Sequence, residues 1–256
     1  MTSRSEAAAV TAKREAPHRR AELDTLRGLT LLSMIAYHAC WDLVYLFGQN
    51  WAWYRSEGAY CWQQSICWTF ILLSGYCWQL GRHQLRRGLT VFGGGVLISA
   101  VTYLLMPASR IFFGVLSLIG AAMLLTIPLH RLFRRIPAAL GAAGGFALFL
   151  LLRGVNGGTV CFGHLAVPEW LYRDYFTACL GFPPAGFYSS DYFSLLPWLF
   201  LFFTGYFLYR LFPQGPERQL RLPLVTAMGR RSFEVYLLHQ PVVFGLLSAA
   251  DFLRLI

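Results

Sequence analysis

The sequence predicts an all-α membrane protein, a polytopic bundle of about seven transmembrane helices. Of the 256 residues, 56% are hydrophobic and only 13% are charged, and the mean hydropathy is +0.48. These values exclude an ordinary soluble globular domain. In addition, apolar stretches that are long enough to cross a hydrocarbon core of about 30 Å recur along the chain.

Seven apolar stretches alternate with polar or basic segments. They are residues 26–47, 60–80, 89–106, 111–129, 137–152, 192–211 and 233–249. Clusters of Arg and His end the second and the fourth stretch, and a long polar segment follows the fifth. The fifth stretch is short, and its Gly141 and Gly145 form a GxxxG pattern that favours close helix packing. Plain flexibility is the alternative interpretation of these two glycines.

Residues 1–25 are rich in Ala, Arg and Glu and have no apolar core, so they are interpreted as a flexible, basic cytoplasmic tail rather than a signal peptide. The remaining residues, 26–256, form one membrane-embedded domain. Of the 22 Lys and Arg residues, 17 fall in the tail and in alternate loops. This asymmetry predicts a cytoplasmic N-terminus and, with seven spans, a C-terminus on the outer side. The net charge of +10 therefore indicates topology and requires no nucleic acid; the expected partner is the lipid bilayer.

The first apolar stretch carries three polar groups, Arg27, His38 and Asp42. At about 100° per residue, His38 returns to within roughly 20° of the direction of Arg27, and Asp42 adds about 40°. The three groups therefore lie in one stripe. Because ionisable groups inside a bilayer are costly and usually functional, we expect His38 and Asp42 to face the bundle interior, a partner or water. A buried His–Asp pair that only joins two helices is the alternative.

A second histidine, His239, lies about 12 Å in from Arg231, and His38 lies about 17 Å in from Arg27. Two histidines at similar depth on different helices can share one cavity. A histidine that only hydrogen-bonds to a neighbouring helix explains His239 equally well. The arginine clusters at the inner ends of the helices are suited to anionic lipid or to a nucleotide phosphate.

The six cysteines have neither a close CxxC pair nor zinc-finger spacing, so no metal site is expected. Cys161 and Cys179 share the long polar segment, and a disulfide between them stays open as one possibility in an oxidising compartment.

Five blocks of the chain carry a family resemblance. In chain order they are ELDTLRGLTLLSMIAYHACWDL, FILLSGYCWQLGR, RIFFGVLSLIGAAMLL, GFPPAGFYSSDYFSLLPWLFLFFTGYFL and GRRSFEVYLLHQPVV. Together they resemble small bacterial relatives of the heparan-α-glucosaminide N-acetyltransferase catalytic domain. The spacing from Arg27 to His38 is also similar to a motif of the broader membrane acyltransferases. The resemblance implies an acetyltransferase of the bacterial cytoplasmic (inner) membrane. It would bind acetyl-CoA from the cytoplasm and pass the acetyl group to an amino or hydroxyl group of a sugar-like acceptor on the outer side.

The resemblance also implies roles for individual residues. His38 is the general base or the acetyl carrier, Asp42 orients its imidazole or binds the acceptor, and His239 joins the catalytic set. The residues expected to hold the phosphates of CoA are Arg27, Arg86, Arg87, Arg230 and Arg231. Those expected on the acceptor side are Asp191, Tyr192 and Trp198. The chain departs from the family at two places: residues 48–60 contain no histidine, and Ser117 stands where bacterial relatives often have one.

Two other classes remain alternatives. In a transporter or permease, the polar stripe of His38 and Asp42 would line a path, although the chain has no detectable inverted repeats. In a bis-His haem protein, His38 and His239 would be the axial ligands.

Overall fold

The structure, a computed structural model, describes residues 21–213 and 222–254. Seven of its helices lie at the seven predicted stretches. They are α2 (Ala21–Tyr45), α3 (Glu57–Tyr76), α4 (Gln84–Leu105), α5 (Val115–Phe133), α6 (Ala138–Leu151), α8 (Leu195–Leu211) and α10 (Ser232–Phe252). The shorter elements are α7 (Tyr175–Leu180), α9 (Pro223–Arg230), β1 (Thr159–Val160), β2 (Leu165–Ala166) and 3-10 turns at Ala52–Arg55, Pro107–Ser109, Val155–Gly157 and Glu169–Leu171. The prediction of an all-α helix bundle is confirmed.

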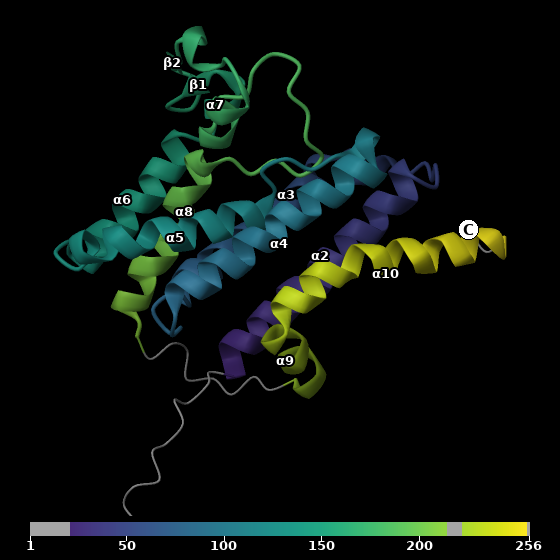
Figure 1. Cartoon of the computed structure of the whole chain (residues 1–256), viewed down its shortest axis with the longest axis horizontal. Helices are drawn as coiled ribbons and strands as arrows, with labels where there is room; N and C mark the ends of the chain where they lie inside the picture. Colours follow the sequence, from purple (N-terminus) through teal and green to yellow (C-terminus); the bar gives the residue numbers. More distant parts are fainter. Residues whose placement is uncertain (1–20, 214–221, 255–256) are drawn as a thin grey trace, which may run out of the picture.

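The helices form two groups (Figure 1). In the first group, α4 packs against α5, and α8 packs against α3, α5 and α6. The largest apolar core lies here and includes Trp78, Leu201 and Tyr206. In the second group, α2 packs against α9 and α10, and it joins the first group through α3. Residues of both groups line the cavity of the candidate site.

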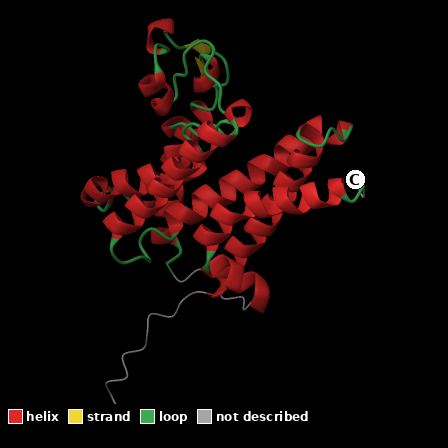
Figure 2. Ribbon diagram, turned by 45° about the vertical axis from the view of Figure 1, so that its right-hand side comes forward, coloured by secondary structure: helices red, strands yellow, loops and turns green. Residues whose placement is uncertain are grey.

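The polar segment between α6 and α8 folds into a small cap at one end of the bundle (Figures 1 and 2). Its strands β1 and β2 pair antiparallel, with Thr159 opposite Ala166. Asp174 begins α7 with a capping box, because its side chain accepts a hydrogen bond from the backbone N–H of Thr177 and the Thr177 hydroxyl accepts one from the Asp174 backbone N–H. The hydrogen bond from the Thr177 backbone N–H to the carboxylate lowers the pKa of Asp174. The sequence indicated a polar segment here but not its strands.

The GxxxG pattern of α6 packs against α8. A Cβ atom at Gly141 would lie 2.4 Å from the ring of Phe207, and one at Gly145 would lie 2.9 Å from the Thr204 hydroxyl oxygen. Both distances are shorter than real Cβ contacts, so α8 can approach this closely only where α6 has glycine. The expectation of close packing is confirmed over flexibility.

Three predicted boundaries were wrong. Residues 21–25, assigned to the tail, form the first turns of α2, because Asp24 and Thr25 are buried against α9 and the hydroxyls of Thr25 and Thr226 hydrogen-bond at 2.7 Å. The rest of the tail, residues 1–20, lies outside the described residues. The basic loop before α10 contains α9, and α4 begins at Gln84, five residues earlier than the apolar stretch.

Four helical segments of the described chain are long and apolar enough to cross a membrane: 84–105, 115–133, 138–157 and 232–252. A shorter apolar helix covers 195–211. The polar residues of α2 lower its hydropathy. The total of seven spans and the sides of the two termini therefore stay predictions.

Candidate active site

The polar stripe of α2 faces the helices that follow residue 222. Arg27 donates a hydrogen bond to the Gly229 carbonyl of α9 at 3.4 Å. Further along α2, the ring centroid of His38 lies 5.0 Å from that of His239 on α10. Asp42 is fully buried. The stripe therefore faces partner helices, and the rings of the two histidines are neighbours. Neither histidine is part of the lining of the two cavities described below, so the expectation that they share a cavity stays a prediction.

His239 has a defined tautomer. Its Nδ1 lies 2.6 Å from the carbonyl oxygen of Tyr236, so the hydrogen-bond network assigns the proton to Nδ1. The other ring nitrogen, Nε2, then carries a lone pair, and it is buried without a hydrogen-bond partner among the described residues. A buried imidazole nitrogen of this kind can accept a proton from a bound substrate.

Asp42 is held by Gln240 and not by His38. Gln240 Nε2 donates to Asp42 Oδ1 at 2.6 Å, and within the described chain no hydrogen bond joins His38 to Asp42. The prediction that Asp42 fixes the imidazole of His38 was therefore wrong for this structure. Asp42 Oδ2 and Gln240 Oε1 are buried without a described partner, like His239 Nε2. Asp42 Oδ2 and Gln240 Oε1, on two side chains that hydrogen-bond to each other, suit a ligand that donates hydrogen bonds.

A cavity of about 540 Å³ lies between α2, α3, α4, α5, α9 and the start of α10. Its basic lining residues are Arg27, Arg82, His83, Arg86, Arg87 and Arg230. Four of these are predicted phosphate-binding residues, and the structure brings them together from three helices. Sequence reasoning did not select Arg82 and His83, although both belong to the basic cluster that begins after the second apolar stretch.

The arginines of this cavity are not equivalent. Arg27 and Arg230 lie at 3.0 and 3.6 Å from the carboxylate of Asp24, and Arg27 also donates to the sulfur of Cys77 at 3.1 Å. By contrast, Arg82, Arg86 and Arg87 have no carboxylate partner in the described part of the chain. These three guanidinium groups therefore leave the cavity positively charged and open to an anion.

One predicted phosphate ligand lies elsewhere. Arg231 joins α9 to α10, is exposed and does not line the cavity. A Cβ atom at Gly81 would lie 1.3 Å from Arg87 Nη1, so a larger residue there would require the flexible Arg87 side chain to move. A glycine at this position leaves the space that the Arg87 guanidinium occupies.

The cavity extends from its arginines toward the histidine pair. Its wall follows α5 from Met123 to Val115, and its lining on α10 ends at Tyr236. Gly94 lies about 10 Å beyond Arg87 along α4, and a Cβ atom at Gly94 would contact the ring of Phe233. Phe233 of α10 is therefore about 10 Å from Arg87 along the cavity, and Tyr236 is one helical turn further. The rings of Tyr236 and His239 are 5.4 Å apart. The cavity therefore extends about 15 Å from Arg87 to Tyr236, whose ring is next to that of His239.

Asp191 lies at the far end of this path. The backbone N–H of Val115, a residue of the cavity wall, donates to its Oδ2 at 3.3 Å. Asp191 belongs to the segment between α7 and α8, outside the membrane-spanning helices, and its burial raises its pKa to about 6. The carboxylate accepts only one described hydrogen bond, which offsets part of the loss of water contact.

The other two residues predicted on the acceptor side take part in packing. The hydroxyl of Tyr192 donates to the Ala178 carbonyl at 2.5 Å. The ring of Trp198 is buried against Phe193 and lies 5.5 Å from the guanidinium of Arg153. Neither residue lines the Arg-lined cavity, so only Asp191 of the predicted acceptor set lies next to it.

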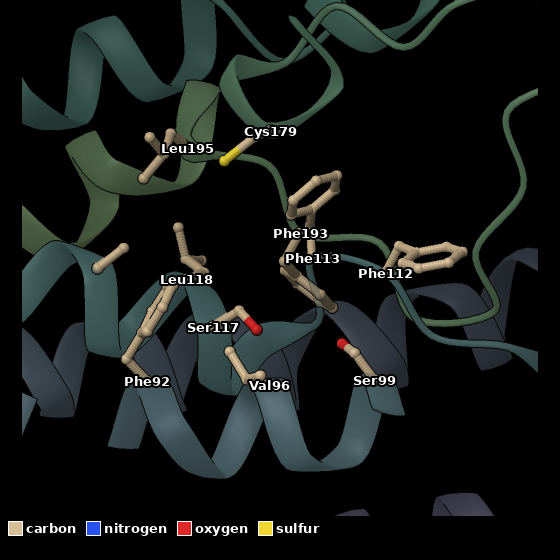
Figure 3. A pocket seen from close by; sticks show the side chains of 11 residues that line it. Phe92, Val96, Ser99, Phe112, Phe113, Ser117, Leu118, Cys179, Phe193 and Leu195 are labelled. Atoms are coloured by element: carbon tan, nitrogen blue, oxygen red, sulfur yellow. The ribbon is translucent and has the colours of Figure 1, made fainter. Parts of the chain in front are cut away.

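A second cavity, of about 210 Å³, lies between α4, α5 and the cap (Figure 3). Phenylalanine rings form much of its lining, and it contains none of the predicted site residues. Cys179 points toward it, and burial raises the pKa of this thiol. Both Cys179 and Cys161 are free thiols, so the structure does not contain the disulfide considered between them. Within residues 21–213 and 222–254, no three His, Cys, Asp or Glu side chains gather to hold a metal ion.

The fold and the site define a class: an α-helical membrane protein in which an Arg-lined cavity extends to Tyr236, next to the His38–His239 pair. The family can be stated as well. The model of the family described as heparan-alpha-glucosaminide N-acetyltransferase, catalytic, matches residues 19–241, and the chain belongs to this family. The resemblance seen in the sequence is thereby confirmed, and the chain is a transmembrane enzyme of the acetyltransferase type. Neither the curated proteins nor the solved structures contain a match to the chain.

Proposed function

We propose that the protein transfers an acetyl group from cytoplasmic acetyl-CoA to an amino or hydroxyl group of a sugar-like acceptor that arrives from the outer side. One observation carries this proposal: the Arg-lined cavity runs about 15 Å toward the His38–His239 pair. Acetyl-CoA is an extended molecule with phosphates at one end and a reactive thioester at the other. The arginines suit its phosphates, and the histidine pair suits its thioester. The proposal also includes the location of the protein in the bacterial inner membrane.

The donor end would bind the phosphates of CoA. Arg86 and Arg87 are the principal ligands in this proposal, with Arg82 beside them, because they have no carboxylate partner among the described residues. Guanidinium groups bind phosphate oxygens through charge-assisted, often bidentate hydrogen bonds. Arg27 and Arg230 would contribute positive charge while they hold Asp24, and Arg231 would act only through its charge at a distance.

The reaction would take place at His38 and His239. His38 deprotonates the acceptor or carries the acetyl group, and His239 supports it with an Nε2 that is free to accept a proton. Asp42 and Gln240 present acceptor atoms that suit the N–H or O–H groups of the acceptor. Asp191 would bind the acceptor at the outer end, where Tyr192 and Trp198 support the surrounding structure.

Binding of acetyl-CoA to the purified protein in detergent tests the donor site. We expect calorimetry to give micromolar affinity for the wild type and a loss of about tenfold or more for Arg86→Ala combined with Arg87→Ala. Arg131→Ala is the matched control, since Arg131 is an exposed arginine of α5 that does not line the cavity. Equal affinity in all three proteins would refute the assignment of this cavity, and absence of binding would favour the permease alternative.

His38→Ala tests the reaction centre. We expect this variant to bind acetyl-CoA as the wild type does and to lose acetyl transfer, because Arg27, at the phosphate-binding end of the cavity, is about 17 Å from His38 along α2. Transfer is measured from radiolabelled acetyl-CoA to glucosamine, which offers both amino and hydroxyl groups. Full transfer by a folded His38→Ala protein would rule out its proposed role.

A further inference from the structure

The side chain of Tyr236 lies between the two ends of the proposed reaction path. It is the outermost residue of α10 that lines the Arg-lined cavity. Its ring packs edge-on against Phe70 at 6.3 Å and against His239 at 5.4 Å. Both Phe70 and Tyr236 line the cavity, so a ligand that extends from the arginines toward His239 passes this aromatic pair.

The backbone and the hydroxyl of Tyr236 have different partners. Its carbonyl oxygen accepts the Nδ1 proton of His239 at 2.6 Å, which fixes the ring of that histidine relative to Tyr236. The phenol hydroxyl has no hydrogen-bond partner among the described residues, and Tyr236 is not fully buried. The hydroxyl is thus a neutral hydrogen-bond donor on a cavity-lining residue next to His239, without a structural partner that would explain it.

We propose that Tyr236 is a catalytic residue that donates a hydrogen bond to the thioester oxygen of acetyl-CoA. This inference rests on the proposed function. The acceptor nitrogen or oxygen attacks the carbonyl carbon, and its proton passes to an imidazole of the His38–His239 pair. The electron pair of the C=O bond moves to the oxygen, which accepts the Tyr236 hydrogen bond. When the tetrahedral intermediate collapses, the C–S bond breaks, and the CoA thiolate takes the proton from the imidazole.

The phenol is suited to this task because it is neutral and preorganised. A neutral donor stabilises the negative charge that develops on the oxygen, and it does not bring a second charge into the bilayer. Packing against Phe70 and His239 fixes the ring, so little reorganisation is needed when the charge forms. The bond gains strength only in the transition state, which predicts an effect on kcat and not on substrate affinity.

Tyr236→Phe tests the inference, with Tyr103→Phe as the matched control, since Tyr103 lies on α4 and is 58% exposed. The assay follows the release of the CoA thiol from acetyl-CoA in the presence of glucosamine, which counts transfer and hydrolysis together. We expect Tyr236→Phe to lower kcat by about 10²–10³-fold, with the acetyl-CoA KM and the melting temperature unchanged. Tyr103→Phe should keep full activity.

The outcomes separate the two proposals. Wild-type protein that binds no acetyl-CoA and releases no thiol overturns the proposed function, and the role of Tyr236 with it. If the wild type is active and the kcat of Tyr236→Phe is within twofold of the wild-type value, only the role of Tyr236 is overturned. If Tyr236→Phe instead raises the KM or unfolds at lower temperature with kcat unchanged, Tyr236 shapes the cavity and is not catalytic. Tyr236→Leu, which also loses the ring packing, should lower both kcat and the melting temperature.

Discussion

Asp191 should make the stability of this protein decrease as the pH rises from about 4 to about 6. Burial raises its pKa from 3.8 to about 6 in the folded protein. Between these values the folded state binds more protons than the unfolded state, so the free energy of unfolding falls as the pH increases through this window. The difference corresponds to about 3 kcal/mol. This is an upper bound, because the side chain is only half-buried and keeps some contact with solvent.

Asp191→Asn removes the ionisation and keeps an oxygen for the N–H of Val115. We expect the variant to match the wild type near pH 4 and to be more stable at pH 7 by up to about 3 kcal/mol. Urea unfolding in mild detergent, followed by tryptophan fluorescence from pH 4 to pH 7.5, measures this difference. Asp174→Asn is the control. The hydrogen bond from Thr177 lowers the pKa of Asp174, so its carboxyl stays ionised above pH 5. The loss of stability caused by Asp174→Asn should therefore be constant above pH 5. A pH-independent difference for Asp191→Asn, or a variant less stable at pH 7, would refute this reasoning.

Two further predictions concern the packing of the bundle. Gly141→Leu should destabilise the protein by about 1–3 kcal/mol because its side chain must displace the ring of Phe207. Gly144→Leu, where a Cβ atom would meet nothing within 4 Å, should be nearly neutral in the same unfolding assay. Arg210 donates at 2.6 and 2.9 Å to two carbonyl groups at and just after the end of α5, where carbonyls lack helical partners. Arg210→Met should therefore cost about 1–2 kcal/mol. The exposed Arg131→Met should change stability by less than about 0.5 kcal/mol, and equal effects of the two arginine substitutions would contradict the capping role.

The helices and the polar stripe followed from local properties of the chain. Apolar stretches of membrane length have few folded alternatives, because backbone polar groups in a bilayer must be satisfied within the segment. Helical periodicity then predicted that His38 and Asp42 lie on the same face of α2 as Arg27. The glycines of α6 predicted a close helix contact but not its partner, which proved to be α8.

Partner choice between distant segments could not be predicted. Gln240 directly follows His239, yet nothing in its local sequence indicates that it binds Asp42, almost 200 positions away. The start of α4 was misplaced for a related reason: Arg86 and Arg87 are polar but helical, and hydropathy detects the apolar core of a helix and not its charged first turn. The short helix α9 was missed because its eight residues are too few and too polar to register as an apolar span.

By itself, the sequence determined the class of the protein, the positions of seven long helices and the family to which the chain belongs. Only the tertiary structure decided which of the many arginines share a cavity and which of them, Arg27 and Arg230, are held by Asp24. It also decided that Tyr236 and Asp191 lie at the far end of that cavity. The physical reason is that helix formation depends on neighbours within a few residues, whereas a site depends on how separate helices pack against one another.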